Sequence, residues 1–191
     1  MFEVRLHGRG GQGVVTAAEM LSIAAFLEGR HAQAFPSFGS ERTGAPVVSF
    51  CRIDDKPIRL REPILEPDAV IVQDPTLLAA VQVLQGLKPQ GYVLLNSKKS
   101  LDELGLAAAL GGLPEGHVRI VPATEIALRH VGRPLPNAAL LGAFAAVVEG
   151  LLHFASVEAA IRQKFAGRVA DANVAAAHQA FELMHALPEE V

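Results

Sequence analysis

The sequence predicts an α/β fold built on a mixed, mostly parallel sheet. Short apolar stretches typical of buried strands alternate with helical patterns up to about residue 131, and that alternation is typical of an α/β sheet. From Asn137 onward only helical patterns follow. We therefore expect a Rossmann-like sheet with helices on both faces and a helical C-terminal segment. The chain is predicted to form a single domain over 1–191, with the sheet part at 1–135 and the helical tail at 136–191.

Hydrophobic spacing in the first third of the chain predicts three strands and one long helix. The strands are expected over 2–6, 31–35 and 47–53, and the helix over 12–28. The helix follows a glycine-rich turn, residues 8–13, and Gly29 stands where a helix C-cap belongs. Residues 58–60 are expected to pair back on 47–53 across the turn at 54–57, and this hairpin makes the sheet mixed.

The remaining two thirds predict three more strands and several helices. A fully apolar strand is expected over 69–72, and such a run is typical of a sheet covered on both faces. A second buried strand is expected over 92–95, and a last strand over 118–121. A capping-box pattern, Ser100 to Glu103, is expected to open a short helix. Longer helices are expected over 75–85, 124–131, 137–154, 157–165 and 169–186.

Composition excludes several classes of function. The chain has 191 residues, of which 50% are hydrophobic and 19% charged, and this is too apolar for a disordered protein. A net charge of −3 offers no general attraction to nucleic acid or to anionic lipid. The start lacks a signal-peptide pattern, and the apolar stretch at 138–148 is shorter than the ~20 residues of a spanning helix. We expect a cytoplasmic protein that binds neither nucleic acid nor a membrane.

Cysteine usage and motif content argue against a complete enzyme. Cys51 is the only cysteine, so the chain alone can form neither an internal disulfide nor an iron–sulfur cluster held by thiolates. It has no G-x-S-x-G elbow, no phosphate-binding P-loop and no H-E-x-x-H motif. The seven histidines are scattered. These absences indicate part of an enzyme, with no catalytic residue and no metal ligand assigned to this chain.

The glycine-rich turn is the strongest local signal for a ligand. Gly8, Gly10 and Gly13 satisfy G-x-G-x-x-G between a predicted strand and a predicted helix. Glycine permits a tight turn and close backbone approach, and the helix N-terminus offers free N–H groups to an anion. The turn therefore predicts a phosphate-bearing ligand, and the alternative is a tight strand-to-helix turn with no ligand.

A nicotinamide dinucleotide fits this turn poorly. That site requires an acidic residue ~20 positions on, at the end of the second strand, and the segment 32–36 carries no carboxylate. The loop from Phe35 to Gly44 is expected to leave the second strand beside the glycine-rich turn. Arg42 would then bring a positive charge to a phosphate bound there. The alternative is that the Arg42 side chain is simply solvated and contacts no ligand. Lys98 and Lys99, at another strand end, could extend a phosphate patch, but a solvated helix entry is the favoured interpretation.

Three motifs in order resemble the gamma subunit of the 2-oxoacid:ferredoxin oxidoreductases. They are Gly8-Arg-Gly-Gly-Gln-Gly13, Ser37-Phe-Gly-Ser-Glu-Arg-Thr-Gly44 and Gly132-Arg-Pro-Leu-Pro-Asn137 with Leu140-Leu-Gly142. The tail segment Phe165 to Asn173 is also similar to that family. The resemblance covers nearly the whole chain, about 1–186.

The resemblance implies a multi-subunit enzyme that converts a 2-oxoacid and coenzyme A to acyl-CoA and carbon dioxide and passes electrons to ferredoxin. Thiamine diphosphate, magnesium and 4Fe–4S clusters are then expected on partner subunits, namely alpha, beta and a ferredoxin-like delta. This chain is expected to help bind coenzyme A and to assist assembly. The residues carried over to the coenzyme A site are Gly8, Arg9, Gly10, Gly11, Gln12, Gly13, Ser40, Arg42, Thr43 and Asn137.

Several points stay open at the level of sequence. Some fused pyruvate enzymes of the family carry adjacent lysines where this chain has Glu41 and Arg42, so Glu41 opposes the charge of Arg42. The identity of the 2-oxoacid is not readable, and an indolepyruvate sub-branch stays open. The alternatives are a stand-alone NAD(P)-binding oxidoreductase of Rossmann type and a scaffold subunit that binds no ligand.

Overall fold

The computed structural model describes residues 1–37 and 42–186 and contains one six-stranded sheet. The strand order is β2-β3-β1-β4-β5-β6. Strands β1, β4, β5 and β6 are parallel neighbours, and β3 runs antiparallel to both β1 and β2. The strands are β1 (Phe2–Arg9), β2 (His31–Pro36), β3 (Pro46–Asp54), β4 (Ala69–Val72), β5 (Tyr92–Asn96) and β6 (Val118–Val121). The predicted mixed, mostly parallel sheet is confirmed.

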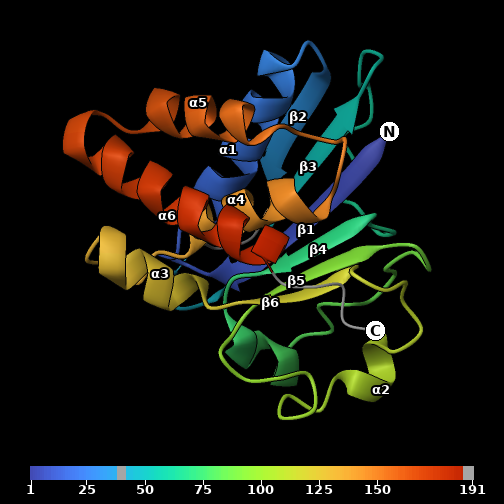
Figure 1. Cartoon of the computed structure of the whole chain (residues 1–191). Coiled ribbons are helices and arrows are strands. Elements are labelled where there is room, and N and C mark those ends of the chain that lie inside the picture. The colour runs from blue at the N-terminus through green and yellow to red at the C-terminus, as the bar shows by residue number, and fades with distance from the viewer. Residues whose placement is uncertain (38–41, 187–191) are drawn as a thin grey trace.

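Helices cover the two faces of the sheet unequally (Figure 1). The long helices lie together on one face, and only a short 3₁₀ helix, a one-turn helix and irregular segments cover the other. The helices are α1 (Val14–Leu27), η1 (Pro75–Ala79), α2 (Ala107–Leu110), α3 (Ala123–His130), α4 (Asn137–Val147), α5 (Phe154–Lys164) and α6 (Gly167–Ala186).

The alternation of side chains along the strands divides the core into two layers. Val4 and Leu6 of β1 are fully buried against the long helices, together with Ile71 of β4. Val70 and Val72 of β4 point to the opposite face and pack with the segments around η1 and α2. Because successive residues of a strand point to opposite faces, each apolar strand contributes to both layers.

Three local predictions are wrong. Residues 58–60 are not in a strand, and the predicted hairpin does not form, because β3 already pairs with β1 on one side and β2 on the other. The helix expected over 75–85 is only the 3₁₀ helix η1. The capping box does form, since Ser100 N donates to Glu103 and Glu103 N donates to Ser100 Oγ, but it closes a turn rather than opening a helix.

The apolar surface of the tail lies largely inside the chain's own core. All residues of α4 from Asn137 to Ala146 are buried, because α4 lies between the sheet and α6 (Figure 1). Several large hydrophobic side chains outside the tail stay exposed to solvent. One of them is Phe26, near the end of α1, which is 72% exposed. Among the described residues, no helix has the length and hydropathy needed to cross a bilayer.

Candidate functional site at the carboxyl edge of the sheet

The glycine-rich turn lies where open α/β sheets bind their ligands. From β1 the chain passes through α1 to β2 on one side, whereas β4 and β5 lie on the other side of β1. The carboxyl ends of β1 and β4 therefore border the point at which the strand order changes direction. Ligands of such sheets bind outside the carboxyl ends of the strands at this switch point.

Backbone hydrogen bonds join the glycine-rich turn to residues 42–45, the described end of the polar loop. Gly10 N donates to Ala45 O over 2.9 Å, and Gly44 N donates to Gly10 O over 3.0 Å. A Cβ on Gly10 would lie 2.3 Å from the backbone oxygen of Arg42, so only glycine permits this approach. The prediction that the loop lies beside the turn is confirmed for these residues.

The turn presents backbone N–H groups to solvent at the start of α1. Gly11 and Gly13 have φ angles of +91° and +74°, which favour glycine. Within the described residues, neither of their N–H groups donates a hydrogen bond, and no side chain caps α1. A Cβ on Gly11 would approach no atom closer than 4.0 Å, so the space outside the turn is open. Donors and space together suit an anion.

A second helix N-terminus meets the first at this turn. Asn137, the first residue of α4, is buried, and its Nδ2 lies 2.6 Å from where a Cβ on Gly13 would stand. Its Oδ1 accepts from Ala138 N over 3.0 Å. The positive ends of the α1 and α4 dipoles therefore converge beside Gly13, and this convergence favours a negative charge there.

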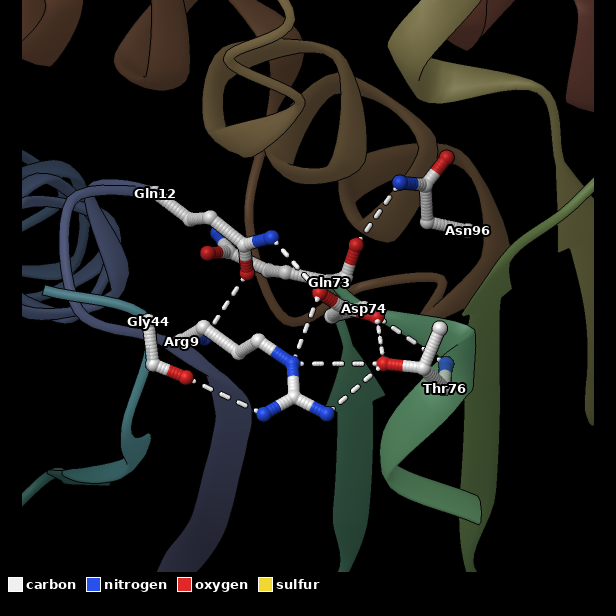
Figure 2. A network of polar contacts seen from close by, with 7 residues as sticks. All are labelled: Arg9, Gln12, Gly44, Gln73, Asp74, Thr76 and Asn96. Carbon is white, nitrogen blue, oxygen red and sulfur yellow. Dashed lines mark hydrogen bonds and ion pairs between the residues drawn. The ribbon is translucent and has the colours of Figure 1, made fainter. Parts of the chain in front are cut away.

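The side chain of Arg9 is held in a network of polar contacts (Figure 2). Its Nη1 donates to Gly44 O over 3.0 Å and its Nη2 to Thr76 Oγ1 over 2.9 Å. Its Nε lies 3.3 Å from Asp74 Oδ2. Arg9 therefore joins the polar loop, the turn and the end of β4, and its donors are largely occupied by the protein.

Gln12 completes this network from within the turn (Figure 2). Its Oε1 accepts from Arg9 N over 2.7 Å, and its Nε2 donates to Asp74 Oδ2 over 2.8 Å. Burial opposes ionisation of Asp74, but hydrogen bonds from Thr76 and Gln12 outweigh it, so the pKa of Asp74 lies below its ordinary value. Asp74 is thus an anion that holds the arginine and the glutamine in place.

Gln73 lies buried beneath the turn with an unpartnered amide. It is 1% exposed, and no described residue pairs with its Nε2 or Oε1. Its Oε1 lies 3.2 Å from where a Cβ on Gly8 would stand, and that Cβ would also clash with Val14 at 2.5 Å. The first glycine of the turn is therefore required by packing against Val14 and Gln73.

The predicted site residues that the structure describes divide into three groups. Gly8, Gly10, Gly11, Gly13 and Asn137 converge on the turn, and Arg9 and Gln12 are used in internal contacts. Arg42 and Thr43 lie beside the turn with exposed side chains. Ser40 and Glu41 lie outside the described residues.

Sequence reasoning missed Asp74 and Thr76. Asp74 follows the apolar stretch of β4 and precedes Pro75, and an acidic residue before proline at the end of a strand is a helix N-cap signal. The structure confirms this role, because Asp74 accepts from Thr76 N over 2.9 Å.

The residues of this chain do not fit an iron–sulfur cluster. Cys51 is fully buried in β3, and burial raises the pKa of its thiol far above the ordinary value. A thiol that is buried and protonated in this way is unreactive. Within the described part of the chain, no three histidine, cysteine or acidic side chains gather as metal ligands.

Comparison with known proteins decides the family. The family described as pyruvate ferredoxin/flavodoxin oxidoreductase matches residues 3–183. The chain belongs to this family. It is 52% identical to the pyruvate/ketoisovalerate oxidoreductases common subunit gamma of Pyrococcus furiosus, over 95% of this chain and 96% of that protein. The resemblance to gamma subunits of this oxidoreductase family is confirmed.

Solved structures of the oxidoreductase family share the fold. The pyruvate oxidoreductase subunit PORC of Thermotoga maritima matches with a TM-score of 0.78 and 36% identity, over 95% of each chain. The 2-oxoglutarate:ferredoxin oxidoreductase of Magnetococcus marinus, solved with 2-oxoglutarate, coenzyme A and succinyl-CoA bound, matches with a TM-score of 0.72. Its identity is 16%, and the match covers 99% of this chain and 32% of that one, so it shows likeness of fold alone.

Proposed function

We propose that this chain is the gamma subunit of a complex that oxidatively decarboxylates a 2-oxoacid with coenzyme A, forming acyl-CoA and carbon dioxide, with ferredoxin as electron acceptor. Its own contribution is to bind a phosphate group of coenzyme A at the glycine-rich turn. Thiamine diphosphate, magnesium and the 4Fe–4S clusters belong to the alpha, beta and delta partners. The chemistry at the oxo group therefore takes place outside this chain.

The observation that carries this proposal is the convergence of backbone donors at the turn. Within the described residues, the N–H groups of Gly11 and Gly13 donate no hydrogen bond, and the space outside Gly11 is open where the N-termini of α1 and α4 meet. A phosphate group there accepts these hydrogen bonds and interacts favourably with both helix dipoles. The presence of coenzyme A in the Magnetococcus marinus enzyme supports this choice of ligand.

The network around Asp74 keeps the turn in this conformation. Gln12 and Arg9 are bound to Asp74 and Thr76, so the turn does not need to order itself when the ligand arrives. A preorganised site avoids part of the entropy cost of binding. Arg42, exposed beside the turn, supplies a positive charge.

The test is the Michaelis constant for coenzyme A in the assembled complex. Arg42→Ala is expected to raise it about fivefold, because an exposed ion pair contributes ~1 kcal/mol or less. Arg42→Lys keeps the charge and is expected to restore most of the affinity. Gly11→Val fills the open space outside the turn and also strains a φ of +91°, so it is expected to have the larger effect.

The constant for the 2-oxoacid is the internal control, because that substrate is assigned to partner subunits. A rise in the coenzyme A constant alone supports the proposal. Unchanged constants for both substrates in Arg42→Ala and in folded Gly11→Val would instead favour a scaffold subunit with an empty turn. Turnover of 2-oxoacid, coenzyme A and a viologen dye by this chain alone would contradict the assignment of the chemistry to its partners.

A role in assembly follows from the same proposal. The apolar faces of the tail helices are largely buried in this chain's own core. We therefore expect the contact with partner subunits at hydrophobic residues that are exposed on the surface. Phe26 and Leu27 at the end of α1 are 72% and 43% exposed. Phe26→Ser is expected to weaken co-purification of the complex without unfolding the chain, and intact co-purification would contradict this contact.

A further inference from the structure

A second pocket opens at the carboxyl ends of β4 and β5. Its volume is about 460 Å³, within the range of ligand pockets. The glycine-rich turn contributes no residue to its wall. The polar side chains that line it are Thr76, Asn96, Ser97, Lys98, Lys99, Thr124 and Glu125.

This pocket adjoins the network around the turn. Thr76 lines the pocket and also accepts from Arg9 Nη2 over 2.9 Å. Adjacent strands are about 4.8 Å apart, so the ends of β1 and β5, with β4 between them, are about 10 Å apart. One extended ligand can therefore reach both the turn and the pocket.

The floor of the pocket is rigid. Asn96 Nδ2 donates to Thr124 Oγ1 over 2.8 Å, and Thr124 N donates to Asn96 Oδ1 over 3.1 Å. Asn96 Nδ2 also donates to Gln73 O over 2.7 Å. Ser97 Oγ accepts from Lys99 N over 2.9 Å, which fixes the backbone from which both lysines project.

The two lysines differ in how firmly acidic groups hold them. Lys98 Nζ lies 3.0 Å from Glu125 Oε1, and the lysine is 66% exposed, so this is a weak surface pair. Lys99 forms no ion pair with any described acidic residue. The nearby carboxylate of Glu103 accepts from Ser100 N over 2.8 Å in the capping box. Lys99 is thus the freer cation at the pocket.

We propose that this pocket binds the 3′-phosphate of coenzyme A through Lys99 and Lys98, while the diphosphate lies at the glycine-rich turn. Coenzyme A carries these two separate phosphate positions, and the structure offers two separate cationic positions at one edge of the sheet. The inference rests on the proposed function and adds a specificity: the subunit distinguishes coenzyme A from dephospho-coenzyme A, which lacks the 3′-phosphate.

The test compares Michaelis constants for coenzyme A and dephospho-coenzyme A in the assembled complex. The wild type is expected to prefer coenzyme A. Lys99→Gln is expected to raise the constant for coenzyme A about fivefold and to leave that for dephospho-coenzyme A unchanged, because only the former carries the contacted group. Lys56→Gln is the matched control, since Lys56 lies in the turn after β3, at the opposite edge of the sheet.

A second variant gives an effect of opposite sign. Glu125→Gln releases Lys98 from its ion pair and removes a negative charge from the pocket. It is expected to lower the constant for coenzyme A two- to fivefold, and again to leave dephospho-coenzyme A unaffected. Unfolding does not produce an improvement that is confined to one of two substrates, so this result separates a binding effect from a structural one.

Arg42→Ala separates failure of this inference from failure of the proposed function. If Arg42→Ala raises the constants for both ligands while Lys99→Gln affects neither, the turn binds coenzyme A and the pocket does not. If Lys99→Gln affects both ligands equally, the lysine does not recognise the 3′-phosphate, and the inference is overturned. If neither variant changes either constant, both proposals fail.

Discussion

Two clusters of polar side chains lie along β1, and arginine has a different role in each. Arg5 and His7 form the inner cluster, buried in the middle of the strand. Arg9 forms the edge cluster with Gln12, Asp74 and Thr76 at the carboxyl end (Figure 2). Residues 5, 7 and 9 alternate with Leu6 and so point to one face of the sheet. Depth along the strand, rather than residue type, separates the two clusters.

The inner cluster is satisfied entirely by the chain. Arg5 Nη2 donates to Val83 O and Gln85 O over 2.9 and 2.5 Å, and Arg5 Nε donates to His7 Nε2 over 3.0 Å. The edge cluster leaves the neighbouring N–H groups of the glycine-rich turn open to solvent. The polar groups of the inner cluster are covered by another segment of the chain and stabilise the fold. The polar groups of the edge cluster lie beyond that segment and position a binding surface.

The largest expected change in stability comes from a substitution that disrupts the inner cluster. Arg5→Met leaves Val83 O, Gln85 O and His7 without their donor, and each unsatisfied buried acceptor costs about 1–3 kcal/mol. We expect the free energy of unfolding, measured by chemical denaturation of the full chain, to fall by about 3 kcal/mol or more. Arg9→Met is the comparison at the edge, where the loss is expected to be about 1 kcal/mol. Equal losses would contradict the distinction between the two clusters.

The next effect is a pH dependence confined to the inner cluster. Burial first, and the Arg5 guanidinium second, lower the pKa of His7 from 6.5 to about 4. The unfolded chain therefore binds one more proton than the folded chain between these two pH values. As the pH falls from above 6.5 through 4, this group is expected to remove about 3 kcal/mol from the free energy of unfolding.

His7→Gln tests this origin of the pH dependence. The variant is expected to lose stability at pH 7 but to show a flatter decline between pH 6.5 and 4 than the wild type. Denaturation curves at several pH values within that window measure the difference. An unchanged decline in the variant would assign the pH dependence to other groups.

The smallest effect concerns the edge cluster and separates stability from binding. Asp74→Asn removes the charge that holds Arg9 and Gln12, and we expect the free energy of unfolding to fall by about 1 kcal/mol. Because the glycine-rich turn then loses its anchor, the Michaelis constant for coenzyme A in the complex is expected to rise about threefold.

Asp68→Asn is the matched control, at the opposite end of the same strand β4. Asp68 pairs with Lys88 over 2.8 Å and accepts from Glu3 N over 2.8 Å, so its loss is expected to cost similar stability. It lies at the amino edge of the sheet, away from the turn, and is expected to leave the coenzyme A constant unchanged. A rise in both variants would mean that the constant follows stability rather than the geometry of the turn.

Local patterns in the sequence predicted most of the elements and part of the site. The strand before the turn, the apolar strands and the tail helices depend on hydrophobic spacing, which a sequence displays directly. The glycines of the turn were likewise recognisable from their spacing. The hairpin at 58–60 was wrong because a short apolar segment does not show which strand edges are already taken.

The sequence by itself determined an α/β sheet and a glycine-rich turn at the start of a helix, because these follow from local spacing and backbone freedom. Only the tertiary structure decided which residues surround that turn. Asp74 and Gln12 are 62 positions apart, and they meet because β4 pairs with β1 rather than with β3. Strand order is set by packing across the whole sheet, so contacts between strand ends are absent from any local pattern.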